Sequence, residues 1–170
     1  MLFRPAWNLS ALLSALLVAP FLLLSSGCES SSVQYNKEGY ASKFGVMAPA
    51  QGGTYRVYAE TTQIHMHPVQ DYVHGFEVIR RDGTQFIGYC EISFPEPIKV
   101  SPEMEKAYTV LDGGRRIRSE GKVFWGLWTS PFWFSEGDPI GPYELKIFID
   151  GDLYRTVKYD VIPFESAIDF

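Results

Sequence analysis

Alternation between apolar and polar side chains is the strongest pattern in this sequence, and it is clearest near the carboxyl terminus. Apolar residues occupy every second position over residues 143–149, and the alternation resumes over residues 157–161, after Asp150-Gly151. A period of two places alternate side chains on opposite faces of a strand. Asp-Gly supplies the positive φ angles that a two-residue hairpin turn needs. The pattern therefore predicts an antiparallel hairpin with one buried face.

Further strands are predicted by runs rich in Val, Ile, Thr and aromatic residues, separated by turns rich in Gly, Pro and Asp. Because Asp82-Gly83 separates two of these runs, 72–79 and 84–94, we expect them to pair as a hairpin. Ser101 as a cap, with Pro102 after it, predicts one helical turn over residues 101–106. The other predicted strands cover residues 54–64 and 122–128.

About seven or eight short strands with turns between them favour an all-β fold, an antiparallel sandwich, over the alternative of a closed barrel. Gly141-Pro142-Tyr143 follows the tight loop Gly137-Asp138-Pro139. This arrangement resembles the tyrosine corner of immunoglobulin-like folds, in which the phenol bonds to the loop backbone. The resemblance implies an Ig-like β-sandwich.

The amino-terminal segment indicates export. Arg4 precedes an apolar run at 9–24, which is too short to span a membrane and is interrupted by Pro20. The sequence Leu24-Ser25-Ser26-Gly27-Cys28 resembles the lipobox of bacterial lipoproteins. That resemblance implies cleavage after Gly27 and a lipid, including palmitate, on Cys28. An ordinary secreted protein with a chance cysteine is the alternative.

These features divide the chain into three parts. Residues 1–27 form a signal peptide, residues 28–32 form the lipidated cysteine and a polar tether, and residues 33–170 form the sandwich domain. The tether extends to residue 50 if the segment after Ser32 does not join the domain. Acyl chains contribute about 0.8 kcal/mol per buried methylene, so they would hold the domain permanently at a membrane.

The residue after the cysteine bears on the membrane chosen. Among lipoproteins, Asp at this position is associated with retention at the inner membrane, whereas this chain has Glu29. The resemblance therefore implies the periplasmic face of the outer membrane as the location.

Composition after cleavage restricts the partners and the role of the thiols. Removal of Arg4 leaves an acidic chain, because all 20 acidic residues lie beyond residue 27. Phosphate binding needs a basic face, and the only basic pairs are Arg80-Arg81 and Arg115-Arg116, so no nucleic-acid partner is expected. Once Cys28 carries lipid, Cys90 is the remaining thiol, and its place in an alternating apolar run predicts a buried role.

A second resemblance covers more of the chain. It rests on Gly75-Phe76 entering a strand, preceded by Gly39-Tyr40 and Thr62-Gln63-Ile64 and followed by Gly141-x-Tyr143 and Tyr159-Asp160-Val161. This order is similar to a family of uncharacterised bacterial exported domains, from which the chain departs at His65, where proline is usual. The resemblance implies a compact extracytoplasmic β domain with a first strand at residues 33–40.

The three histidines, His65, His67 and His74, fall within ten residues of each other. On a strand, His65 and His67 share a face, and a returning hairpin would bring His74 near them. Three imidazoles suit Zn or Cu, so a periplasmic metal-binding protein is one alternative function. The other interpretation is a polar strand end beside Pro68.

Aromatic residues are densest at 123–134, where Trp128, Trp133 and Phe134 form a candidate exposed patch for a glycan or a partner protein. The competing interpretation is core packing, because alternation along a strand buries at least one set of these side chains.

Motifs for catalysis are absent from the sequence. No nucleophile elbow occurs, and Gly113-Gly114 lacks the Lys-Ser/Thr of a phosphate-binding loop. Two carboxylate pairs, Glu103 with Glu105 and Glu136 with Asp138, leave an envelope hydrolase as a further alternative. The function predicted is a non-catalytic binding or structural-accessory module, held at the membrane by lipid, with an envelope protein or glycan as partner. No cofactor is expected beyond the candidate Zn or Cu.

Overall fold

The computed structural model describes residues 33–66, 72–135 and 137–164. Nearly all of its regular structure is strand, with one short α-helix and two short 3-10 turns. The elements are β1 (Tyr40–Pro49), η1 (Gln51–Gly53), β2 (Tyr55–Glu60), β3 (Gln63–Met66), β4 (Val73–Arg80), β5 (Gln85–Ser93), α1 (Pro102–Ala107), β6 (Tyr108–Leu111), η2 (Asp112–Gly114), β7 (Arg116–Ser119), β8 (Lys122–Trp125), β9 (Leu127–Phe132), β10 (Gly141–Ile149) and β11 (Asp152–Pro163).

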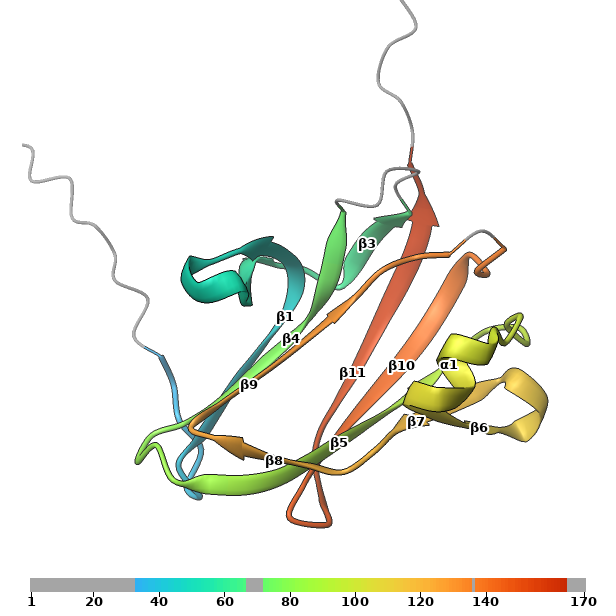
Figure 1. The fold of residues 1–170 in the computed structure, drawn as a ribbon. Coiled ribbons are helices and arrows are strands. Elements are labelled where there is room, and N and C mark those ends of the chain that lie inside the picture. The colour runs from blue at the N-terminus through green and yellow to red at the C-terminus, as the bar shows by residue number, and fades with distance from the viewer. Residues whose placement is uncertain (1–32, 67–71, 136, 165–170) are drawn as a thin grey trace, which may run out of the picture. The chain divides into compact units, whose positions relative to one another are not determined.

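The strands form two facing layers (Figure 1). One layer has the order β2-β1-β4-β9 and the other the order β8-β5-β10-β11-β3, with the β6–β7 hairpin beside β5. The layers are joined where β8 and β9 meet at a single pair, Trp125 with Leu127, around Gly126. Strands β2 and β3 end the order and do not pair among the described residues, so the sheet does not close into the alternative barrel. The predicted sandwich is confirmed, with one parallel pair, β3 with β11.

Aromatic contacts between the layers fill the core. Phe44 of β1 packs on Tyr159 of β11, with ring centres 4.8 Å apart. The inward residues of β10 alternate as predicted, and Leu145 and Ile147 are completely buried. Burial of each such side chain contributes about 1.5–3 kcal/mol, so this strand supplies much of the stability of the sandwich.

Two local predictions are confirmed. Strands β10 and β11 pair as an antiparallel hairpin with Leu145 opposite Val157. Their turn has positive φ angles, 51° at Asp150 and 94° at Gly151. Helix α1 begins where expected, because the Ser101 hydroxyl accepts a hydrogen bond from the Met104 N–H at 3.3 Å.

The expected pairing of residues 72–79 with 84–94 is wrong. Strand β4 is flanked on both sides by β1 and β9, while β5 lies in the other layer between β10 and β8. Both edges of β4 are therefore occupied. The turn at Asp82-Gly83 carries the chain between layers instead of closing a hairpin.

Three predicted segments have other bounds. The strand expected at 54–64 divides into β2 and β3, which lie at opposite ends of the strand order. The strand expected at 122–128 divides at Gly126, whose φ is 65°. The first strand begins at Tyr40 and not at residue 33.

Residues 1–32 lie outside the described part of the chain. The predicted signal peptide, Cys28 and the polar tether fall in this segment. In the described ranges, none of the helices is long and apolar enough to cross a membrane.

Candidate functional site

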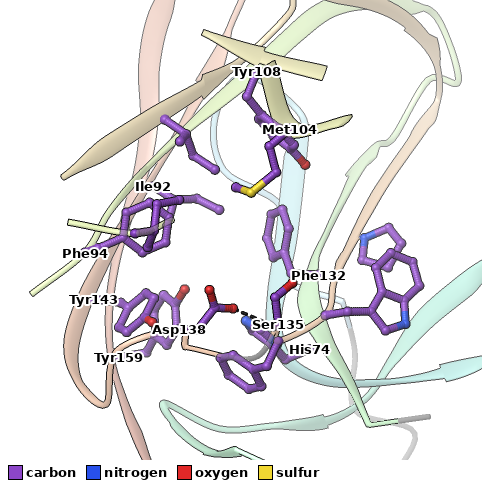
Figure 2. A pocket seen from close by; sticks show the side chains of 15 residues that line it. His74, Ile92, Phe94, Met104, Tyr108, Phe132, Ser135, Asp138, Tyr143 and Tyr159 are labelled. Carbon is purple, nitrogen blue, oxygen red and sulfur yellow. Dashed lines mark hydrogen bonds between the residues drawn. The ribbon is translucent and has the colours of Figure 1, made fainter. Parts of the chain in front are cut away.

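A cavity of about 280 Å³ lies between the two layers, and helix α1 with strands β6 and β7 completes its wall. Met104 and Tyr108 lie at one end of the view in Figure 2, and His74, Ser135 and Asp138 lie at the other. The size approaches the lower end of ordinary ligand pockets, about 300 Å³. Seven aromatic residues line it: Phe94, Tyr108, Phe132, Trp133, Phe134, Tyr143 and Tyr159.

The loop after β9 is fixed beside the cavity by its own hydrogen bonds. The Tyr143 hydroxyl donates to the Pro139 carbonyl at 2.7 Å, which confirms the predicted tyrosine corner. The Ser135 N–H donates to Oδ2 of Asp138, also at 2.7 Å, and the Asp138 N–H returns a bond to the Ser135 carbonyl. These bonds hold the Asp138 side chain at the cavity wall.

His74 projects inward from β4 and is only 3% exposed. Its ring stacks on Phe134, with centres 4.6 Å apart and planes at 16°. Nδ1 has no hydrogen-bond partner among the described residues. Burial lowers the pKa of His74 to about 3, so the imidazole is neutral at ordinary pH.

The other ionisable groups of the cavity are also desolvated. Burial raises the pKa of Asp138, although the bond from the Ser135 N–H acts in the opposite direction. Burial likewise raises the pKa of the Tyr143 and Tyr159 phenols. The cavity therefore combines apolar walls with a few polar groups that water solvates poorly.

Acid should destabilise the domain through His74. The unfolded histidine binds a proton below pH 6.5, whereas the native one resists protonation until about pH 3, so stability falls as the pH decreases through this range. Between pH 7 and pH 4.5, the free energy of unfolding of the wild type should fall by about 2 kcal/mol more than that of His74→Phe. Urea unfolding at the two pH values measures both changes. His65→Gln, which changes an exposed histidine, should behave as the wild type. The same pH dependence in His74→Phe would contradict this origin of the acid sensitivity.

The candidate metal site receives no support from the described histidines. His65 lies exposed on β3, whereas His74 is buried in the core. His67 falls outside the described residues, so the three-histidine Zn or Cu site stays a prediction. The part of the chain that the structure describes contains no group of three His, Cys, Asp or Glu side chains able to hold a metal ion.

The candidate aromatic patch requires one correction. Trp128 is a core residue, 4% exposed, which stacks on Phe124 and packs edge-on against Phe76. Its ring occupies the space above Gly88, where an added Cβ would lie 2.6 Å from the indole. Trp128 therefore does not belong to an exposed patch.

The other two members of the patch lie at the cavity. Trp133 is 48% exposed, with its ring edge-on to Tyr55, and Phe134 is half-buried against His74. Both line the cavity wall. Aromatic density identified these residues, but nothing in the sequence indicated that His74 and Asp138 would join them.

The remaining candidates for chemistry are Cys90 and the two carboxylate pairs. Cys90 is buried, which confirms its predicted buried role, and burial raises the pKa of its thiol to about 11. Glu105 is exposed on α1, and Asp138 is described without Glu136. The paired carboxylates of a hydrolase therefore stay a prediction.

A comparison with protein families identifies the fold. A model described as the PM0630 beta sandwich domain matches residues 42–162. The chain belongs to this family. The PM0630 beta sandwich domain thus spans β1 to β11 and contains the whole cavity wall. With its tyrosine corner, the domain is an immunoglobulin-like β-sandwich.

The comparison with solved structures shows a likeness that is distant in sequence. The crystal structure of an immunoglobulin-like protein from Pseudomonas aeruginosa is 14% identical in sequence. The alignment covers 76% of this chain and 94% of that one, with a TM-score of 0.41. No curated protein matches the sequence.

Proposed function

We propose that this chain is a lipid-anchored protein of the cell envelope whose sandwich domain acts without catalysis as a binding or structural-accessory module. One observation carries the proposal: a cavity of about 280 Å³ between the layers is lined by seven aromatic residues together with the desolvated carboxyl group of Asp138. Apolar pockets with a few polar groups are typical ligand sites. A ligand that covers the aromatic rings and pairs with the carboxyl group would gain affinity and stabilise the domain.

The location follows from the resemblance of residues 24–28 to a lipobox. Lipid on Cys28 would keep the domain beside the membrane, and Glu29 favours the periplasmic face of the outer membrane. The domain would then meet envelope components from a fixed position, which raises their effective concentration at the cavity.

Labelling with radioactive palmitate tests the anchor. We expect label on the wild type and on Cys90→Ala, and none on Cys28→Ala. Cys90 is a suitable control because its thiol is buried in the core. Label that persists on Cys28→Ala would exclude lipidation at this cysteine. Density-gradient fractionation of the labelled membranes would then distinguish the outer from the inner membrane.

Crosslinking in intact cells tests the binding role. A photoreactive phenylalanine analogue at Trp133 places the probe at the cavity wall, and the same analogue at Tyr58 places it on exposed β2. We expect a defined crosslinked species from position 133 and none of the same mass from position 58. Identical products from both positions, or none from position 133, would contradict binding at the cavity.

A further inference from the structure

The groups that line the cavity share one electrostatic character. Asp138 is the only residue among those lining it that is ordinarily charged at neutral pH, because burial keeps His74 neutral. None of the described lining residues is Lys or Arg. Lys99 lies nearby, close to Gly137, but its side chain is exposed and forms no ion pair with Asp138. The cavity lining therefore contains one carboxyl group and neither Lys nor Arg.

The directions of the hydrogen bonds agree with this character. Tyr143 uses its proton on the Pro139 carbonyl, which leaves the phenol oxygen as an acceptor. Oδ2 of Asp138 accepts from the Ser135 N–H, and a carboxylate retains further acceptor sites. Acceptors thus dominate the polar end of the cavity.

Seven aromatic rings line the cavity together with the aliphatic residues Ile92, Ile98, Met104, Ile117 and Pro131. Ring faces carry partial negative charge and attract cations within about 6 Å, by about 0.5–2 kcal/mol per contact when the cation is desolvated. Phe132, Phe134 and Tyr159 surround the buried side of His74, and Trp133 lies beside them. Several rings with one carboxylate form the arrangement that suits an alkylated ammonium group.

We propose that the cavity binds an organic ammonium group, which lies against the aromatic rings and pairs with the Asp138 carboxylate. This inference rests on the proposed function of the cavity as a binding site and assigns its ligand class. A small free quaternary ammonium compound and the headgroup of a choline lipid share this chemistry.

Calorimetric titration of the purified full chain with choline and with 3,3-dimethyl-1-butanol tests the charge requirement. The alcohol replaces the nitrogen with carbon and keeps the shape, so it serves as the neutral control. We expect choline to bind at least about tenfold more tightly, since one tenfold step is within the energy of a desolvated cation–π contact. Equal affinity of the two compounds would overturn the ammonium proposal while leaving a binding cavity. Absence of binding by both would overturn the ammonium proposal as well.

Substitution at Asp138 tests its role as the counter-charge. Asp138→Asn keeps an acceptor for the Ser135 N–H but removes the charge, so choline affinity should fall by about tenfold with the alcohol unchanged. Asp160→Asn, an exposed carboxylate on β11 beside Tyr159, should leave both affinities unchanged. An equal thermal midpoint for the two variants would show that both are folded. Unchanged choline affinity in folded Asp138→Asn would overturn the pairing.

Glycerophosphocholine distinguishes the two sources of the ammonium group. Tighter binding of glycerophosphocholine than of choline would support the cavity and identify a lipid headgroup. The reverse preference would also support the cavity and identify a small free quaternary ammonium compound.

Discussion

Replacing Trp128 with alanine should lower the free energy of unfolding by about 3–5 kcal/mol, as expected for an aromatic ring removed from a packed core. The indole lies 4.7 Å from the Phe76 ring and 4.8 Å from the Phe124 ring, measured between centres. It also covers Gly88, whose missing side chain makes room for it. Urea unfolding of Trp128→Ala and the wild type measures the loss.

The neighbouring Trp125 supplies the matched control. Its side chain is 73% exposed on β8, so Trp125→Ala should change stability by no more than about 0.5 kcal/mol. Comparable losses in the two variants would contradict the placement of Trp128 in the core and of Trp125 at the surface.

Arg56→Ala should cost about 3 kcal/mol, because it leaves a buried carboxylate without its counter-charge. The Glu77 side chain is 3% exposed, and the Arg56 Nε donates to its Oε2 at 2.6 Å. The Val57 N–H, at 3.3 Å, is the other donor to this oxygen. Thermal or urea unfolding at neutral pH checks the expected loss.

Two further variants separate the buried charge from other causes. Lys37→Ala removes one partner of the exposed pair with Glu38 and should be nearly neutral, since surface pairs contribute about 0–1 kcal/mol. The double variant Arg56→Met with Glu77→Leu removes both charges and should recover most of the stability. A double variant as unstable as Arg56→Ala alone would show that the unpaired carboxylate is not the cause.

Features that depend on neighbouring residues could be predicted from the sequence. The β10–β11 hairpin, the start of α1 and the tyrosine corner are each determined within a few residues. Pairing between strands that are distant in the sequence could not be predicted in this way. The turn at Asp82-Gly83 has the composition of a hairpin turn, yet β4 already pairs on both edges with strands from distant parts of the chain.

The candidate site was predictable only in part, for the same physical reason. Trp133 and Phe134 were recognisable from the local density of aromatic residues. For Trp128 the competing interpretation, core packing, is correct, because it shares a face with Phe124, as the alternation indicated, and stacks on that ring. The approach of His74 to Asp138 depends on the packing of β4 against the loop after β9, and no local pattern encodes that contact.

The central claim is that the cavity between the layers is a ligand site. The chain has four methionines, and one of them can serve as a direct probe of the cavity. Met104 lines the cavity, whereas Met47 is buried against Gly75 elsewhere in the sandwich. The measurement is an NMR titration of the full chain, labelled with ¹³C at the methionine methyl groups, with choline or 3,3-dimethyl-1-butanol. We predict a saturable shift of the Met104 resonance with at least one of the two compounds, while the Met47 resonance stays in place. A Met104 resonance that moves with neither compound, or no more than that of Met47, would contradict the account.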